Sequence, residues 1–315
     1  MSNLLKTHLL CEFVFGPPYT TPPLNETRGY YDGLKPIIDG ILKTVAPQVR
    51  WSVFQKQNTS KDYIITHKDL SLLSDDVFFD ELRLTLRILT DAKEGESDGE
   101  YDFKKTLIQR DSYGGVVCKP VIVITAVGDS VMRICVSLST ALAHELTHAY
   151  SEYRHFLSRG ERVRLPTSYS AARAVINVHD EAFIRRFIGV STYCLFGMEK
   201  AAMVAQVYNE LMPYAHEIHD GESAEKAIRK TQSFKRFYLV LQRNLKIFED
   251  YPFDEEQSRI IVDAARFATR KKFNTYADVR TYYIPRLKRW LHDYIIKVSK
   301  IAHDISIANG YDVMD

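Results

Sequence analysis

The chain has 315 residues, of which 45% are hydrophobic and 26% are charged, and its formal net charge at pH 7 is +2. This length suffices for one large or two modest domains with real cores, and the composition is ordinary for a globular protein. The near-balanced charge excludes an overall electrostatic preference for nucleic acid or for an acidic surface.

The first 127 residues are predicted to be mostly strands with one or two helices. Leu9–Phe15 favours a strand, and the two Pro-Pro pairs of residues 16–23 favour a stiff loop, because proline disrupts both helix and sheet pairing. Apolar residues then keep helical spacing from Leu34 to Val45, and we expect this helix to stop at Pro47.

Short strands are predicted between this helix and residue 127. Leucine and isoleucine alternate with arginine and threonine over residues 82–88, which indicates a half-buried strand, although helix is an alternative from Phe79 onwards. An acidic, glycine-containing loop is expected over residues 91–102. The other predicted strands are Val49–Gln55, Tyr63–Thr66, Lys104–Gln109 and Val116–Val127.

Two helices are predicted next, over residues 131–159 and 178–187. Ser130 ends a turn and supplies an N-cap, and neither proline nor glycine interrupts residues 131–159. A glycine and a proline between the two helices let the chain loop back. The strand just before the first helix can offer its edge to an extended peptide, which would bind as an added strand.

From about Glu199 the pattern becomes helical throughout. The predicted helices are Lys200–Met212, Ser223–Phe248, Phe253–Lys271 and Tyr276–Ala308. Because strands are followed by helices, we expect an α+β fold. We place a domain with a mixed sheet and two helices at residues 1–195 and a helical C-terminal subdomain at residues 196–315.

His144, Glu145 and His148 form an H-E-x-x-H sequence within an alanine-rich helical run. Residues four apart lie on one helix face about one turn apart, so both imidazoles can bind one metal ion. The carboxylate beside the first histidine can then act on metal-bound water. This pattern is typical of zinc-dependent peptide hydrolysis, with Zn²⁺ as the cofactor. The alternatives are a surface helix with solvated histidines and a purely structural metal site.

A catalytic zinc site needs a third protein ligand from outside this motif. His155 would lie about 10 Å further along the same helix, which is too far to reach the ion. The helix predicted over residues 178–187 carries His179 and Glu181, and His179 lies nearer its apolar face. The two are two residues apart and cannot both face one ion from a regular helix. We therefore expect His179 as the third ligand, with Glu181 as the alternative.

This part of the chain resembles the zincin metallopeptidases. An H-E-x-x-H-A-Y helix at His144–Tyr150 and a later H-x-x-x-F segment at His179–Phe183 are most similar to the SprT-like group. The resemblance covers Val121–Val190 and implies a zincin-like fold for the first domain. It also implies zinc ligands at His144, His148 and His179, with Glu145 as the general base. Gluzincin relatives use a downstream glutamate instead, which would correspond to Glu181.

Two features bear on the setting in which such an enzyme works. The four cysteines, at positions 11, 118, 135 and 194, form no paired C-x-x-C motif and favour a reduced, intracellular chain without a zinc ribbon. Leu9–Phe15 is too short for a signal peptide and contains Glu12, and no stretch is long enough to span a bilayer. We therefore expect a cytoplasmic protein without a membrane segment.

The predicted function is that of a zinc metallopeptidase acting on proteins or peptides, with Glu145 accepting the proton of the attacking water. Candidate donors to the oxyanion are Tyr169, Tyr193 and His155. Candidates to orient the ligating histidines are Asp180 and Glu152.

Two other functions stay open. One is a structural or assembly protein that keeps the metal site of a zincin fold and belongs to a larger assembly. The other is a nucleic-acid-associated protease, for which the basic residues between Arg154 and Arg164 and between Lys226 and Arg236 provide the support. A solvated helix face is the simpler interpretation of these basic residues, because glutamates lie nearby.

Overall fold

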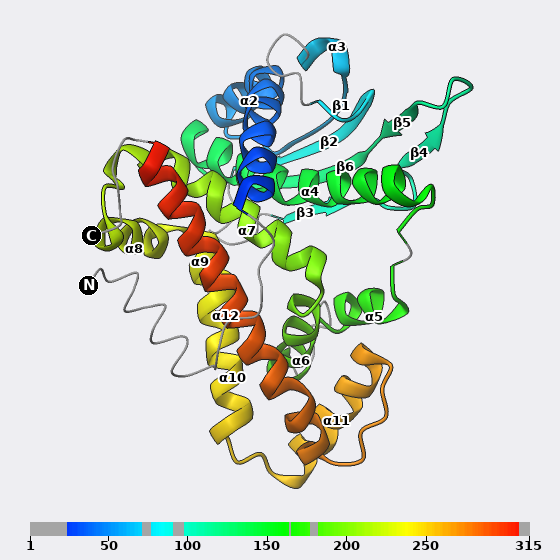
Figure 1. Ribbon diagram of the computed structural model, residues 1–315, viewed down its shortest axis with the longest axis vertical. Coiled ribbons are helices and arrows are strands. Elements are labelled where there is room, and N and C mark those ends of the chain that lie inside the picture. The colour runs from blue at the N-terminus through cyan, green and yellow to red at the C-terminus, as the bar shows by residue number, and fades with distance from the viewer. Residues whose placement is uncertain (1–23, 71–76, 91–97, 164, 177–181, 309–315) are drawn as a thin grey trace. The chain divides into compact units, whose positions relative to one another are not determined.

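The computed structural model describes residues 24–70, 77–90, 98–163, 165–176 and 182–308 (Figure 1). These residues form a small mixed sheet, a hairpin and many helices, which confirms the α+β class. Two compact units are present. One, the sheet unit, holds the described residues of Pro22–Val163 together with Tyr208–Glu210, and the other, the helical unit, holds those of Arg164–Val207 and Leu211–Asp315. The domain boundary predicted after residue 195 stays a prediction.

The sheet unit is built on four strands in the order β1-β2-β6-β3. The neighbours β2 and β6 run parallel, whereas β1 and β3 are antiparallel to β2 and β6 respectively. Strands β4 and β5 form a separate hairpin (Figure 1). The elements are α2 (Leu24–Gln55), β1 (Thr59–Thr66), α3 (His67–Leu70), β2 (Glu81–Leu89), β3 (Asp98–Tyr101), β4 (Leu107–Arg110), β5 (Val116–Lys119), β6 (Val121–Val127) and α4 (Val131–Arg159).

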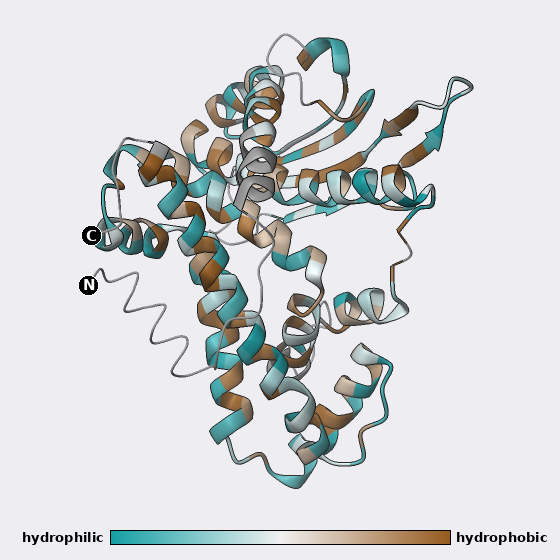
Figure 2. Ribbon diagram, viewed as in Figure 1, coloured by the Kyte–Doolittle hydropathy of each residue, from teal (hydrophilic) through white to brown (hydrophobic). Residues whose placement is uncertain are grey.

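The core of this unit lies between the sheet and helix α4. Every second residue of β2 from Leu82 to Ile88 is buried, as the alternation predicts. The same alternation of hydrophobic and hydrophilic residues is visible along the sheet strands in Figure 2. Helix α4 packs against β6, β3 and α2. Each fully buried leucine or isoleucine contributes roughly 1.5–3 kcal/mol, so this packing fixes α4 on the sheet.

The strand predicted over Val49–Gln55 is wrong, because helix α2 continues through Pro47 to Gln55. Val49 and Ser52 extend the buried stripe of the helix beyond the proline. Ser52 and Gln48 also hydrogen-bond to Thr59 of β1, at 2.7 and 2.9 Å. The free energy gained from this burial and these hydrogen bonds exceeds the cost of the backbone hydrogen bond that Pro47 removes.

The loop expected over residues 91–102 is wrong at its end, because Asp98–Tyr101 forms strand β3. Its sequence lacks β-branched residues, but its backbone pairs antiparallel with β6 and its Tyr101 is buried. The single strand predicted over residues 116–127 is divided at Pro120, which has no N–H to donate within a ladder. The first part, β5, instead pairs with β4 in the hairpin.

The helical unit carries most of the C-terminal half of the chain. Helix α5 packs on α6 and α11, and the long helix α12 packs on α8, α10 and α11. Phe248 and Tyr283 stack at 5.0 Å between ring centres in the core of this unit. The elements are α5 (Thr167–Ile176), α6 (Ala182–Cys194), α7 (Gly197–Leu211), the 3₁₀ helix η1 (Met212–Glu217), α8 (Gly221–Lys230), α9 (Gln232–Phe234), the π-helical turn η2 (Lys235–Leu239), α10 (Val240–Asp250), α11 (Glu255–Thr269) and α12 (Tyr276–Ala308).

Most of the predicted C-terminal helices are confirmed, but Ser223–Phe248 is not one helix. Thr231 adopts an extended backbone conformation between α8 and α9, with φ −64° and ψ 139°. Its side chain accepts a hydrogen bond from Phe234 N and so caps the second helix. Within the described part of the chain, no helix has the length and apolar character needed to cross a membrane.

Candidate metal centre

Helix α4 carries the H-E-x-x-H motif and is defined at both ends. Ser130 caps the N-terminus, where its hydroxyl accepts a hydrogen bond from Arg133 N at 3.3 Å, as predicted. Gly160 ends the helix with φ 70°, a left-handed conformation that glycine adopts at low cost. The predicted helix over residues 131–159 is therefore confirmed, and the motif lies in its interior.

The two histidines of the motif lie side by side on a buried face. His144, Glu145 and His148 are 8%, 5% and 3% exposed. The imidazole ring centres of His144 and His148 are 4.8 Å apart. Solvated histidines on a surface helix, one of the alternatives from the sequence, are therefore excluded.

Glu199 of α7 completes a group of three side chains that can hold a metal ion. One ligand atom from each of His144, His148 and Glu199 lies within 4.8 Å of the other two. All three side chains are buried, and Glu199 is not exposed at all. Two imidazoles and one carboxylate are a ligand set that zinc uses in catalytic sites, where a fourth position stays open.

Helix α7 belongs to both units, since its residues Tyr208–Glu210 group with the sheet unit. There Asn209 Nδ2 donates to Ser139 Oγ of α4 at 2.9 Å. Glu199 lies ten residues earlier in the same continuous helix, about 15 Å along its axis.

Glu199 is a candidate that the sequence analysis did not find. The helix was expected to begin at Lys200, three residues after its observed start at Gly197, so Glu199 was left outside it. On the observed helix, Glu199 falls on the buried stripe formed by Ala202, Met203 and Val207. An acidic residue at helical spacing with an apolar stripe is unusual, because burying a carboxylate costs free energy unless it is bound. A glutamate at helical spacing from these apolar residues is therefore the sequence signal that could have identified Glu199 as a candidate ligand.

The predicted third ligand, His179, and its alternative, Glu181, lie outside the described residues, as does Asp180. Their roles stay predictions. His155 lies on α4 beyond His148, is half-buried and is not a member of the described metal-ligand group. This agrees with the argument that its position along the helix is too far from the ion.

Strand β3 passes directly beside Glu145. A Cβ atom added at Gly99 would lie 2.6 Å from Glu145 Oε1 and 2.9 Å from its Cγ. These distances are shorter than normal van der Waals contacts, so any side chain at position 99 would force the Glu145 carboxylate to shift. The backbone of β3, the last strand in the order of the described sheet, thus borders the carboxylate of the motif.

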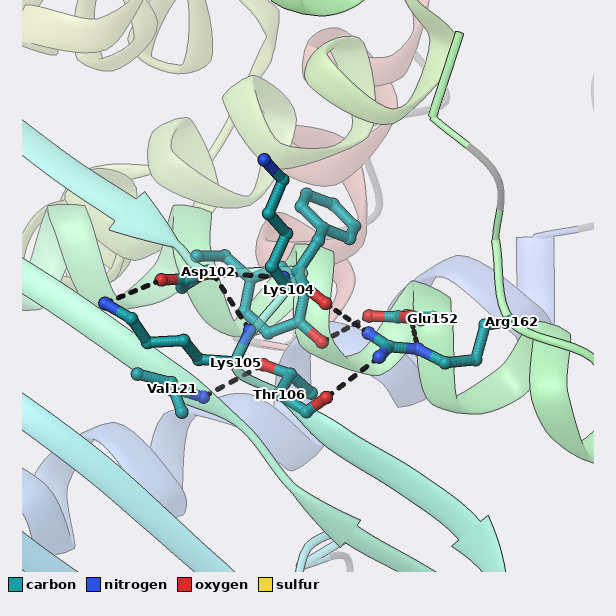
Figure 3. Close-up of polar contacts among 9 residues, drawn as sticks. Asp102, Lys104, Lys105, Thr106, Val121, Glu152 and Arg162 are labelled. Atoms are coloured by element: carbon teal, nitrogen blue, oxygen red, sulfur yellow. Dashed lines mark hydrogen bonds and ion pairs between the residues drawn. The ribbon is translucent and has the colours of Figure 1, made fainter.

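A polar network joins the C-terminal end of β3 to helix α4 (Figure 3). Glu152, which is 1% exposed, accepts hydrogen bonds from Tyr101 Oη at 2.5 Å and from Arg162 Nε at 2.7 Å. Arg162 also donates to the backbone carbonyls of Thr106, at 2.9 Å, and of Phe103. Burial, together with the Glu152 charge, raises the pKa of Tyr101, which therefore stays a donor.

This network places the segment after β3 beside the second histidine. The ring centre of Phe103 lies 6.2 Å from that of His148. Glu152 was a candidate to orient a ligating histidine, but it accepts hydrogen bonds from Tyr101 and from Arg162, and the one from Arg162 can be followed in Figure 3. These two hydrogen bonds fix β3 and the turn after it against helix α4.

Tyr169 of α5 contacts Glu199 within the helical unit. Its hydroxyl donates to Glu199 Oε1 at 2.7 Å, and both side chains are buried. Burial, with the Glu199 charge as the next cause, raises the pKa of Tyr169, so the phenol remains protonated. The ring of Tyr193, another predicted oxyanion donor, lies 5.6 Å from that of Tyr169.

Several of the basic residues between Lys226 and Arg236 are paired with carboxylates. Lys226, Arg229 and Lys230 form ion pairs with Glu222, Glu225 and Glu217 at 2.7–3.0 Å. This arrangement is that of a solvated helix face, and Arg162 is engaged in the buried network described above.

The cysteines add no further metal ligands to the described group. Cys118, Cys135 and Cys194 are free thiols, and Cys11 lies outside the described residues. Comparison of the chain with protein-family models, with curated proteins and with solved structures gives no match. The geometry of the site is therefore the observation from which a function can be proposed.

Proposed function

We propose that this chain is a zinc-dependent peptidase of the zincin type, in which His144, His148 and Glu199 hold the metal. The observation that carries the proposal is the buried group formed by these three side chains. Glu145 follows His144 on the same helix and is equally buried, so a carboxylate stands beside the two imidazoles. The proposal replaces the predicted ligand His179 by Glu199, and His179 remains the alternative that an experiment must test.

The donor set supports a catalytic rather than a structural role. Structural zinc sites use four cysteine or histidine ligands, whereas catalytic sites use three ligands and leave a position for water or substrate. The described group offers two imidazoles and one carboxylate, with no thiol among its members. Such a set suits zinc and other first-row divalent ions.

His144, His148 and Glu199 would hold the zinc ion, which when bound would polarise the scissile carbonyl and lower the pKa of the attacking water to about 7. Glu145 takes the proton of the attacking water at its carboxylate and passes it to the leaving amine. The β3 backbone at Gly99 lies beside this carboxylate, since a Cβ atom added at position 99 would touch it. His144 and His148 are fixed by a helix that is packed on the sheet.

Strand β3 supports a mode of peptide binding. We expected the strand before α4 to bind an extended peptide along its edge, but that strand, β6, lies between β2 and β3 in the sheet, so this expectation is wrong. β3 stands at the end of the strand order and borders Glu145 at Gly99. An extended peptide hydrogen-bonded along β3 would bring a peptide bond close to Glu145.

The test is hydrolysis of a mixed peptide library by the purified protein, followed by mass spectrometry. Wild type should cleave peptides, lose activity with 1,10-phenanthroline and regain it with added zinc. Glu145→Gln should bind zinc as wild type does and abolish cleavage, whereas Glu256→Gln, on an exposed part of α11, should leave both unchanged. Cleavage by Glu145→Gln at the wild-type rate would contradict the mechanism. Metal binding without any cleavage by wild type would reject the peptidase proposal and favour a structural or assembly role.

A further inference from the structure

Tyr169 and Glu199 form a buried pair whose chemistry is not used in the mechanism above. The phenol donates to Oε1 of the carboxylate at 2.7 Å. The two residues come from different helices, α5 and α7, and are 30 positions apart in the chain. Hydrogen bonds to charged groups are stronger than those between neutral groups, so this contact restrains the rotation of the carboxylate.

The surroundings of Tyr169 fix the direction of its hydroxyl. Its ring meets Phe196 edge to face at 5.3 Å and lies 5.6 Å from the ring of Tyr193. Its backbone N–H donates to Pro166 O at 2.9 Å in the first turn of α5. All of these contacts lie within the helical unit, so the phenol is held in place by packing that does not involve a metal.

We propose that Tyr169 is the positioning residue of Glu199: by engaging Oε1, it presents Oε2 as the one oxygen that binds the metal. The inference rests on the proposed function, since it takes Glu199 to be a metal ligand. Carboxylates bind metals through one oxygen or through both, and ligating carboxylates in metal sites are themselves hydrogen-bonded. One-oxygen binding keeps the number of protein ligand atoms at three, which leaves a position open for the reaction.

Loss of the Tyr169 hydroxyl should alter both the affinity for the metal and its coordination number. Removing the hydroxyl of Tyr169 releases Oε1, which then turns towards the ion and occupies the open position. Loss of a hydrogen-bonding partner of a metal ligand typically lowers metal affinity 10–100-fold. Binding of Glu199 through both oxygens also raises the coordination number of the ion. Because the visible absorption of Co²⁺ is weaker in five-coordinate than in tetrahedral sites, this rise can be measured.

The experiment compares wild type with Tyr169→Phe, using Co²⁺ as the probe and a competing chromophoric chelator to measure affinity. The variant should bind Co²⁺ about 10–100-fold more weakly and with a reduced absorption per ion. The matched control is Tyr283→Phe, which removes another buried hydroxyl of the helical unit, bonded to Thr192 instead of Glu199. It should keep the wild-type affinity and spectrum.

A double variant separates positioning from general damage to the fold. In Glu199→Gln, the further change Tyr169→Phe should have no additional effect on Co²⁺ affinity, because Tyr169 acts through Glu199. A merely structural role would instead lower affinity equally in both backgrounds and would overturn the inference. Wild-type affinity and spectrum in Tyr169→Phe would overturn it too.

A measurement on wild type covers the case in which the variant does not fold. The infrared difference spectrum between zinc-loaded wild type and Glu199→Gln should show the wide separation of carboxylate stretching bands that one-oxygen binding produces. A narrow separation, typical of binding through both oxygens, would contradict the inference while leaving the proposed function intact. If wild type binds neither Co²⁺ nor zinc, the proposed function and this inference both fail.

Discussion

Gly99 of β3 lies so close to Glu145 of α4 that a Cβ atom at position 99 would stand 2.6 Å from Glu145 Oε1. The next nearest atoms, Cγ and Cδ, belong to the same side chain, at 2.9 and 3.1 Å. An added methyl group at this position therefore meets the carboxylate and not a rigid backbone. The relationship joins the edge of the sheet to the residue proposed as the general base.

Gly99→Ala should displace the Glu145 carboxylate and lower peptide hydrolysis about 100-fold, because a misplacement of about 1 Å costs that much in an active site. Zinc affinity should stay at the wild-type value, since the three atoms nearest to the new methyl group all belong to Glu145 and none to a ligating histidine. The measurements are the turnover of a cleaved library peptide and zinc titration.

The control for this change is Gly197→Ala at the start of α7, where an added Cβ meets no atom within 4 Å. It should keep both turnover and zinc affinity. Unchanged turnover in Gly99→Ala would show that β3 does not constrain the base. Loss of zinc in the same variant would indicate damage to the whole site.

The identity of the third ligand is tested by comparing Glu199→Gln with His179→Gln and Glu181→Gln. Glu199→Gln should lower zinc affinity at least tenfold, because an amide oxygen carries no charge to offset that of the ion. The other two variants should retain wild-type affinity. The opposite result, loss of zinc only in His179→Gln, would identify His179 as the third ligand, as the resemblance to the zincins implies.

Sequence alone could predict the part of the site that lies within one helix. The spacing of His144, Glu145 and His148 places them together whatever the rest of the chain does, and the cap at Ser130 defines the helix that carries them. The third ligand depends on how a distant segment returns to this helix. Glu199 lies 51 residues after His148, and no local pattern determines that distance.

In the fold, too, elements with a local sequence pattern could be predicted, whereas elements set by non-local contacts could not. Strand β2 was predictable because its alternation of apolar and polar residues is local. Strand β3 was not, because Asp98–Tyr101 has the composition of a loop and becomes a strand by pairing with β6. Pro47 suggested a helix end that the packing of Val49 overrides. Non-local contacts decided β3 and the C-terminal end of α2.

Arg162→Met should destabilise the protein by about 3 kcal/mol, because it leaves the Glu152 carboxylate buried without its cationic partner. The full cost of breaking a buried pair is reduced here because the Arg162 side chain is 35% exposed. Urea denaturation followed by circular dichroism measures the change. Arg159→Met, at the exposed end of α4, should shift stability by less than about 0.5 kcal/mol. Equal effects of the two substitutions would exclude a stabilising role for the network.

Pro47→Ala should raise the stability of the protein by about 1–3 kcal/mol, because it restores a backbone donor inside α2 and removes the clash of the proline ring. The side chain at position 47 is exposed, so no packing is lost. Pro252→Ala, between α10 and α11, should not increase stability, since a loop proline restrains the unfolded chain. A lower midpoint of urea denaturation for Pro47→Ala would contradict the helix described here.

The most direct measurement is the metal content of the purified protein, determined by elemental mass spectrometry after loading with zinc and dialysis. The account predicts one zinc per chain in wild type and none in the double variant His144→Gln/His148→Gln, with circular dichroism spectra that show both to be folded. Folded wild-type protein without stoichiometric metal, or equal zinc in the double variant, would contradict the account.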